Sequence, residues 1–246
     1  MLVEELEESE KLIIKKICQS YPEKLKEYLK VEHIADIKEI QKETSREFLR
    51  FKKTGHNVDD FYKQCKTYLP ELVLYAANPG RIQSVCKRLR ILKRLGINKL
   101  VDYGCGVGID SVVYAKFGIK CICVEFENQS RKFAEYVVDN DEDALDKVVF
   151  ISPDSFLKFD DSYQAIQAIE VVAHLENPYK VFENLMSRCK VFIWTNDIHV
   201  HRDDAENDPQ HLEHSYSKVC KSLEEAGGHK VKFNHMAIPP LVYMRK

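Results

Sequence analysis

One short stretch constrains the fold of this chain more than any other: a predicted strand that runs directly into a glycine-rich turn, Leu100-Val-Asp-Tyr-Gly-Cys-Gly-Val-Gly108. The residues before the glycines are mostly strand formers. The glycines stand at alternate positions, and glycine lets a backbone turn sharply and lets a ligand approach without a Cβ in the way. Residues 109–117 are predicted to form a helix whose amide-rich N-terminus faces the turn. The stretch therefore predicts a strand–turn–helix unit with a ligand at the bend.

A carboxylate follows at the position where the sugar of a nucleoside would need it. The next predicted strand, 120–125, ends in Glu125, which lies 21 residues after Gly104. A carboxylate at that place can accept two hydrogen bonds from the hydroxyl groups of a ribose. Strand, glycines, helix and acid occur in order, which favours a nucleoside-binding βαβ unit.

Two departures argue against a dinucleotide as the ligand. The dinucleotide pattern G-x-G-x-x-G requires a third glycine at the position that Ile109 occupies here. Asp102, just before the turn, would repel a pyrophosphate and suits a ligand that carries an ammonium group.

The pattern D-x-G-C-G-x-G, followed by V-E at the end of the second strand, resembles motifs I and II of the class I S-adenosylmethionine-dependent methyltransferases. The resemblance covers roughly residues 97–246. It implies S-adenosyl-L-methionine as cofactor. It also implies an α/β fold, a Rossmann-like, seven-stranded, mostly parallel methyltransferase sheet, here with an N-terminal α-helical cap.

The chain divides into two predicted parts. Residues 1–95 are expected to form a helical region that covers the cleft and selects the substrate, and residues 96–246 the S-adenosylmethionine-binding methyltransferase domain. Apolar periodicity in the first part predicts five helices. The first two span 3–19 and 23–30, with a break at Tyr21-Pro22 between them, and the third spans about 34–51. Asn57 or Asp59 would cap the fourth, which Pro70 should kink or split, and the fifth spans 81–95.

Two groups of side chains in the helical region admit both a functional and a structural role. Candidates to face the cleft are Tyr62, Tyr68, Tyr75 and His33, although core packing is the ordinary role of buried tyrosines. The helix 81–95 carries six basic residues, Arg81, Lys87, Arg88, Arg90, Lys93 and Arg94. They indicate either a contact with phosphate or RNA or a solvated helix face, and the net charge of the chain favours the solvated face.

Strands and helices alternate through the rest of the chain. Helices are predicted at 129–138, 179–186 and 215–226, and strands at 147–152, 163–172, 189–195, 229–234 and 241–244. Such alternation implies a mainly parallel sheet with helices on both faces. The last two strands have no helix between them, which predicts an antiparallel final strand.

Composition excludes several classes of protein. The net charge of −2 gives no overall electrostatic footprint for nucleic acid. No apolar run reaches the length of a membrane span, and the acidic N-terminus lacks a signal-peptide pattern, so we expect a cytoplasmic protein without a membrane partner. The eight cysteines include no C-x-x-C pair, which predicts reduced core thiols rather than a zinc site or disulfides.

The carboxyl ends of the predicted parallel strands carry the candidate cofactor site, because ligands bind there in open α/β sheets. The backbone of Gly104, Cys105, Gly106 and Gly108 would line the methionine half, and Asp102 is expected to take part in binding the cofactor. Glu125 would bind the ribose, and Phe126 would pack on the adenine. The resemblance implies that Asp154 binds the adenine amine. Ser155 and Glu170 complete the expected cofactor-binding set.

Two histidines are candidate catalytic bases, since imidazole titrates near neutral pH. His174 lies in Glu170-Val-Val-Ala-His174-Leu-Glu-Asn-Pro178, which resembles the E-V-x-x-H-x-x-x-P stretch of small-molecule methyltransferases of this class. It does not resemble the N/D-P-P-Y/F stretch of nucleic-acid amino methyltransferases, so a DNA substrate is not expected. Relatives place a histidine near a Y-S pair where this chain has His211. A purely structural, hydrogen-bonded role is the alternative for each.

A metal site is a more specific alternative role for the histidine-rich segment. His199, His201, His211 and His214 lie within 16 residues of one another, with several aspartates among them. Some relatives, including small-RNA 2′-O-methyltransferases, hold a divalent ion with E-x-x-E-H, but Ala173 replaces the second glutamate here. We therefore predict no functional metal.

Together these features predict an S-adenosylmethionine-dependent methyltransferase that acts on a small-molecule, sugar or peptide acceptor. Two alternatives stay open: an RNA 2′-O-methyltransferase, with or without a metal, and a catalytically silent S-adenosylmethionine-binding partner subunit. The fold alone does not separate them.

Overall fold

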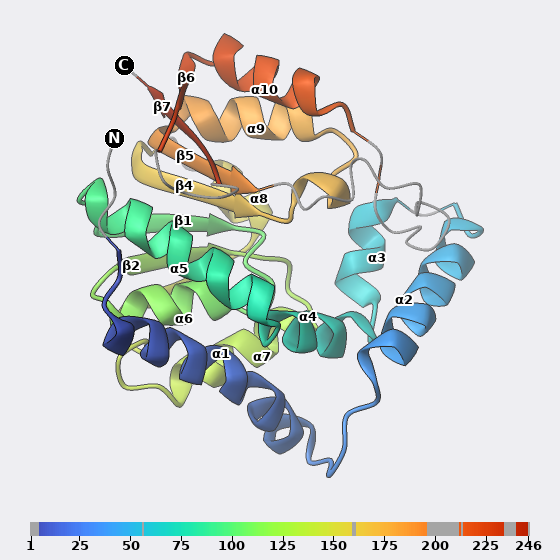
Figure 1. Ribbon diagram of the computed structural model, residues 1–246. Helices are drawn as coiled ribbons and strands as arrows, with labels where there is room; N and C mark the ends of the chain where they lie inside the picture. The colour runs from blue at the N-terminus through green and yellow to red at the C-terminus, as the bar shows by residue number, and fades with distance from the viewer. Residues whose placement is uncertain are drawn as a thin grey trace.

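The computed structural model describes residues 5–55, 57–158, 161–195, 212, 214–233 and 240–245. Its centre is a seven-stranded sheet in the order β3-β2-β1-β4-β5-β7-β6 (Figure 1). The strands are β1 (Lys99–Tyr103), β2 (Lys120–Val124), β3 (Val148–Ile151), β4 (Tyr163–Ile169), β5 (Cys189–Thr195), β6 (Gly228–Val231) and β7 (Leu241–Arg245).

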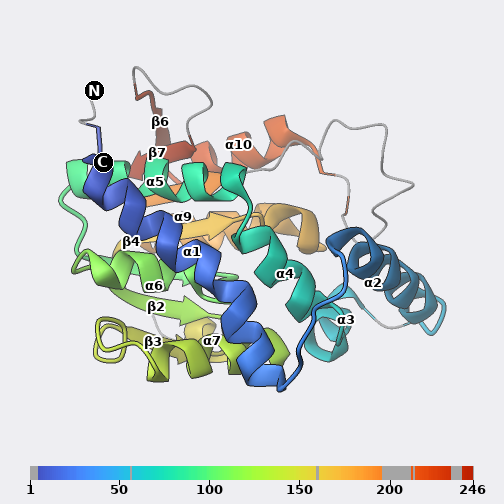
Figure 2. The same ribbon diagram turned by 60° about the horizontal axis from the view of Figure 1, so that its bottom comes forward.

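The helices cover both faces of the sheet and the carboxyl ends of its strands (Figures 1 and 2). They are α1 (Glu8–Leu29), α2 (Ile37–Lys52), α3 (Val58–Gln64), α4 (Tyr68–Ala76), α5 (Pro79–Arg94), α6 (Ile109–Lys116), α7 (Gln129–Asp139), α8 (Pro153–Lys158), α9 (Pro178–Ser187) and α10 (Tyr216–Glu225), with a 3-10 turn at Val172–His174. Among these described segments no helix is long and apolar enough to cross a membrane.

The sheet confirms the predicted α/β fold. Strands β1 to β5 pair in parallel, and β7 runs antiparallel to both β5 and β6. The first strand lies centrally, with β2 on one side and β4 on the other. The strand order therefore reverses at β1, and a crevice opens at the carboxyl ends of strands where such a reversal occurs.

Two apolar cores lie on the two faces of the sheet because successive side chains of a strand point to opposite sides. On β1, Leu100 belongs to the core beneath α1, α5, α6 and α7, and Val101 to the core beneath α8, α9 and α10. On β5 the same alternation separates Ile193 from Trp194. The first core also takes in residues of α4, so most of the N-terminal helices share a core with the sheet.

The predicted break at Tyr21-Pro22 is wrong, because α1 continues through Pro22 as one helix of 22 residues. A proline inside a helix costs about 3 kcal/mol. The helix also buries Ile14, Cys18, Tyr21 and Leu25 completely at helical spacing. Burying large apolar side chains contributes about 1.5–3 kcal/mol each, which outweighs the lost hydrogen bond.

The predicted split near Pro70 is confirmed, although the break precedes the proline. Asn57 caps α3, the chain leaves the helix at Cys65, and α4 begins at Tyr68 with Pro70 in its first turn, where a missing N–H does no harm. One further helix was not expected: α8 begins directly at Pro153, where sequence patterns indicated only a loop.

Candidate functional site

The glycine turn is held against the end of β2. Gly104, Gly106 and Gly108 all have positive φ, at 70°, 55° and 70°. The Gly104 N–H donates to the Val124 carbonyl at 2.8 Å. A Cβ on Gly104, just after β1, would lie 2.6 Å from Cγ2 of Val171, just after β4, so only glycine fits between these two segments.

Glu125 stands directly after β2, facing the turn. Its carboxylate accepts hydrogen bonds from the Gly106 N–H at 2.8 Å and from the Phe126 N–H at 2.9 Å. Burial raises the pKa of this carboxyl, although both backbone donors favour its ionised form. The structure therefore places the buried carboxylate of Glu125 in direct contact with the glycine turn.

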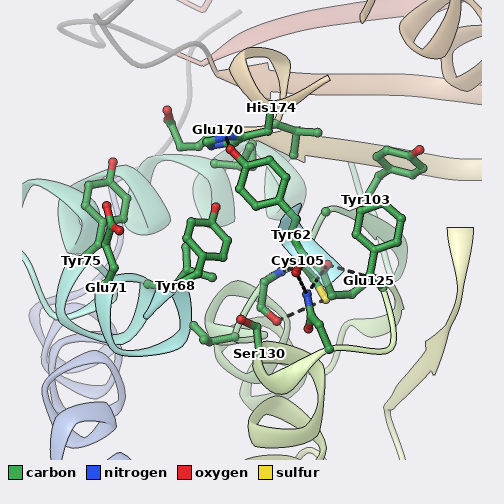
Figure 3. A pocket seen from close by; sticks show the side chains of 18 of the residues that line it. Tyr62, Tyr68, Glu71, Tyr75, Tyr103, Cys105, Glu125, Ser130, Glu170 and His174 are labelled. Atoms are coloured by element: carbon green, nitrogen blue, oxygen red, sulfur yellow. Dashed lines mark hydrogen bonds between the residues drawn. The ribbon is translucent and has the colours of Figure 1, made fainter. Parts of the chain in front are cut away.

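A cavity of about 250 Å³ opens beside these residues (Figure 3). Seven of the residues predicted from the sequence line it: Gly104, Cys105, Gly106, Glu125, Phe126, Glu170 and His174. They come from the ends of β1, β2 and β4, so the topology brings together segments that are up to 70 residues apart. The candidate site therefore lies at the reversal of strand order.

Four other predicted residues lie behind or beside this wall. The buried Asp102 carboxylate accepts hydrogen bonds from Ser111 Oγ and Gln167 Nε2, both at 2.9 Å. Gly108 begins α6 and packs on α7. Asp154 is exposed, and Ser155 donates its N–H to Ser152 Oγ, while the neighbouring Pro153 lines the cavity.

His174 is held by the N-terminal helices. Its Nδ1 lies 2.5 Å from the hydroxyl oxygen of Tyr62 on α3, and the two rings meet edge to face at 5.0 Å. Either partner can be the donor in this hydrogen bond, depending on the tautomer of the histidine. For Nε2 to accept a proton, Nδ1 must carry the hydrogen and donate it to Tyr62.

Helices α3 and α4 form the wall opposite the strand ends. Tyr62, Tyr68 and Tyr75 all line the cavity, whereas His33 is exposed on the connection before α2. Leu72 packs over the glycine turn, with its Cδ1 3.2 Å from where a Cβ on Gly106 would stand. Sequence patterns did not identify Leu72 or its neighbour Glu71, since nothing local distinguishes a lining residue of an amphipathic helix from a core residue.

The side-chain amide of Asn128 joins this helical wall to the carboxylate of Glu125. Asn128 Nδ2 donates to the backbone carbonyl of Tyr62 at 3.1 Å and to the Glu125 carboxylate at 3.4 Å. Lys63 of the same helix lies over the Phe126 ring at 5.0 Å. Contacts of the cap are therefore shared with the residues proposed to hold the nucleoside.

Glu170, directly after β4, has an unusual backbone. Its φ is 60°, which residues other than glycine rarely adopt, and its carboxylate accepts a hydrogen bond from Thr195 Oγ1 at 2.7 Å. Backbone conformations of this kind cost about 1–3 kcal/mol and concentrate at functional sites.

The basic residues of α5 are only partly a solvated face, which corrects the prediction. Arg88 is completely buried, and its guanidinium lies 2.5 Å from Asp110 at the start of α6. Arg81 reaches the same carboxylate at 2.9 Å, and Arg90 pairs with Glu5. Burial alone would raise the pKa of Asp110, but the two guanidinium groups lower it. These arginines are engaged inside the protein rather than offered to RNA.

Three of the four histidines of the candidate metal site, His199, His201 and the predicted base His211, lie outside the described residues. His214 is described, and its Nε2 lies 2.8 Å from the Leu175 carbonyl oxygen. Among the residues that the structure describes, no three His, Cys, Asp or Glu side chains gather in a way that could hold a metal ion.

Comparisons with known proteins agree with this arrangement. A family model described as a methyltransferase domain matches residues 38–225. Magnesium protoporphyrin IX methyltransferase (ChlM) from Synechocystis PCC 6803, solved with bound SAH, is 17% identical with a TM-score of 0.55, over 82% of this chain and 96% of that one. The same enzyme was also solved with bound SAM.

Two further solved structures share the fold. The pyocyanin biosynthetic protein PhzM is 12% identical with a TM-score of 0.56, over 78% of this chain and 62% of that one. The methyltransferase domain of bacterial CtHen1 is 19% identical with a TM-score of 0.50, over 66% and 97%. A search of curated proteins finds no match.

Proposed function

Because this chain belongs to the methyltransferase domain family, within the class I S-adenosylmethionine-dependent superfamily, we propose that it transfers a methyl group from S-adenosylmethionine to a small-molecule, sugar or peptide acceptor. The observation that carries this proposal is the cavity in which the glycine turn, Glu125 and His174 meet. That cavity combines the parts expected for holding a nucleoside donor with a titratable group, His174, just beyond the end of β4.

The residues present fit the proposed donor. The backbone of Gly104 and Gly106 lines the cavity without a Cβ, and over Gly106 stands the side chain of Leu72 of α4. We assign the methionine half to this backbone and the ribose to Glu125, with the adenine on Phe126. Asp154 and Ser155 would lie at the rim beyond Pro153. The cavity of about 250 Å³ is slightly below the ~300–1,000 Å³ usual for ligand sites, so we expect α4 to shift when the donor binds.

When bound, the sulfonium supplies an electrophilic methyl group, so the chain has to align the acceptor, exclude water and remove a proton where the acceptor needs it. We assign alignment to α3 and α4, which cover the strand ends. We assign proton removal to His174, whose ring Tyr62 holds in place. Residues 1–95 would thus form the cap that selects the acceptor, and His211 remains a second candidate base.

The two alternatives predict different behaviour. A silent subunit would bind the donor and transfer nothing until a partner was added. An RNA 2′-O-methyltransferase would label RNA, and no contact in the described residues favours that acceptor over a small molecule.

Calorimetry with S-adenosylhomocysteine, NADH and FAD tests the donor assignment. We expect S-adenosylhomocysteine to bind and the other two not to bind. Gly106→Arg should abolish binding while the far-ultraviolet circular dichroism stays unchanged, because the new side chain fills the space over the turn. Tight binding of a nicotinamide or flavin nucleotide, with no affinity for S-adenosylhomocysteine, would overturn the assignment.

A further inference from the structure

The side-chain amide of Asn128 contacts both the carboxylate proposed to bind the ribose and the helix that holds the candidate base. Resting on the proposed function, we propose that Asn128 is a positioning residue for methyl transfer. It would hold α3 at the end of β2, so that the Tyr62 hydroxyl on α3 is in place to orient the ring of His174. Asn128 would act through Tyr62 and would not itself take the proton.

Both ends of the Asn128 amide are engaged inside the protein, where the residue is only 6% exposed. Its Oδ1 accepts a hydrogen bond from the Arg131 N–H at 2.9 Å, which caps the N-terminus of α7. Its Nδ2 donates to the Tyr62 carbonyl at 3.1 Å and to the Glu125 carboxylate at 3.4 Å. These neighbours fix the orientation of the amide, because the opposite orientation would set its oxygen against two oxygens and its NH2 against an N–H.

The capping of α7 does not by itself explain an asparagine at this position. Serine and aspartate cap helices about as well as asparagine, since a cap needs only an oxygen that accepts from the first turn. Of these three residues, only asparagine presents two N–H donors beside the capping oxygen. The contacts that use these donors, to Tyr62 and to Glu125, are therefore additional to the cap, and they join α3 to the proposed donor site.

The Tyr62 carbonyl lies in the last turn of α3, where the carbonyls of a helix depend on partners outside it. Helix α3 ends at Gln64, and the backbone of Cys65 is extended, with ψ of 126°. The N–H of Lys66, which would bond to the Tyr62 carbonyl in a longer helix, donates to Glu47 instead at 3.4 Å. The Asn128 amide thus meets the C-terminal end of α3 and the N-terminal end of α7 at once.

The apolar side of α3 packs in a small cluster of its own. The buried members of this cluster are Phe48, Phe61, Tyr62 and Cys65, and Phe126 packs against them from the end of β2. Among the described residues, neither of the two cores on the faces of the sheet includes a residue of α3. Because α3 does not share the cores of the sheet, individual contacts such as that of Asn128 determine its position over the strand ends.

Tyr62 meets Asn128 with its carbonyl and His174 with its side chain. The Tyr62 hydroxyl oxygen lies 2.5 Å from Nδ1 of the imidazole (Figure 3). A shift of α3 would therefore move both ends of Tyr62 and change the orientation of the imidazole. A misplacement of about 1 Å can cost ~10²-fold in rate, so the position of α3 bears directly on the proton transfer proposed for His174.

Asn128→Ser separates the two roles, because serine keeps a capping oxygen and removes the amide that reaches Tyr62 and Glu125. The full-length protein is labelled with ¹⁵N-histidine, and long-range ¹H–¹⁵N spectra record the ring nitrogens of His174, assigned by comparison with His174→Gln. We expect Asn128→Ser to move these signals toward their positions in Tyr62→Phe. The double variant should move them no further than Tyr62→Phe alone, because both changes act on one contact.

Two further measurements on Asn128→Ser separate positioning from capping and from donor binding. Amide hydrogen exchange should quicken in residues 58–64 and stay unchanged in residues 129–139, because serine preserves the cap of α7. The affinity for S-adenosylhomocysteine, measured by calorimetry, should fall by no more than about threefold, because the contact with Glu125 is long at 3.4 Å.

Asn78→Ser is the matched control, because Asn78 caps the exposed start of α5 by accepting from the Gly80 N–H at 2.8 Å. It should leave the His174 signals unchanged. Signals of His174 that do not move in Asn128→Ser, or faster exchange in α7 alone, would overturn the positioning role and leave the methyltransferase. A wild-type protein that does not bind S-adenosylhomocysteine would overturn the proposed function and, with it, any role of Asn128 in methyl transfer.

Discussion

The Tyr62 hydroxyl on α3 lies 2.5 Å from Nδ1 of His174, just beyond the end of β4, although 112 residues separate them in the chain. The N-terminal helices and the segment after β4 thus meet in a hydrogen bond at the wall of the cavity. This contact makes the N-terminal helical region part of the proposed chemistry, since it holds the orientation of the ring of the candidate base.

Tyr62→Phe should therefore slow methyl transfer without weakening donor binding. General-base groups contribute about 10²–10⁴ in rate, and we expect His174→Gln to lose most of that. We expect Tyr62→Phe to lose about tenfold, because the phenyl ring stays but the hydrogen bond that orients the imidazole is lost. Turnover with labelled S-adenosylmethionine and calorimetry with S-adenosylhomocysteine measure the two effects. If Tyr62→Phe lowers the affinity as much as the rate, its role is structural.

Glu125→Gln should weaken the binding of S-adenosylhomocysteine by about 1–3 kcal/mol, the usual cost of losing a hydrogen bond to a charged group. The neutral amide can still accept from the Gly106 N–H, so the turn should keep its shape. Glu127→Gln is the matched control, because Glu127 is exposed two residues further along. Equal affinities of the two variants would remove Glu125 from the ribose site.

The meeting of the glycine turn and Glu125 at the cavity was predictable because its signals are local. Strand formers, alternating glycines and an acid after the next strand each follow from backbone requirements within about 25 residues. The mainly parallel sheet with helices on both faces followed from the alternation of strands and helices. Both predictions depend on short-range patterns that tertiary packing rarely overrides.

The helical wall of the cavity was only partly predictable. Tyr62 was among the candidates to face the cleft, and the structure places it there, but Leu72 has the spacing of an ordinary core residue, and only packing of α4 across the strand ends places it in the cavity. In the sequence, Arg88 likewise resembles the other basic residues of its helix. In the fold it is buried, where it pairs with the carboxylate of Asp110, 22 residues further along the chain. Pro22 stays helical because long-range burial outweighs a local preference.

Gly104→Ala should destabilise the protein by more than its backbone strain alone. A residue with a Cβ at positive φ costs roughly 1–2 kcal/mol, and at Gly104 the new methyl also meets Val171 at 2.6 Å. Gly118 is the matched control, with φ of 82° and open space around a built Cβ. Urea unfolding of Gly104→Ala, Gly118→Ala and Gly104→Ala/Val171→Ala separates clash from strain. The double variant should regain the stability lost to the clash but not the stability lost to backbone strain. No gain in stability over Gly104→Ala would contradict this explanation.

Asp102→Asn should stabilise the protein at pH 7 and remove part of its pH dependence. Burial, and then the neighbouring Asp110, raise the pKa of Asp102 to about 6. A carboxyl whose pKa is raised on folding contributes stability below its unfolded value near 4, and that contribution is lost as pH rises to about 6. The asparagine stays neutral and can still accept from Gln167 and donate to Ser111. Urea unfolding at pH 4 and pH 7 should show a gain of about 1–3 kcal/mol for the variant at pH 7 and little difference at pH 4. A loss of stability at pH 7 would mean that the ionised carboxylate is needed by this buried network.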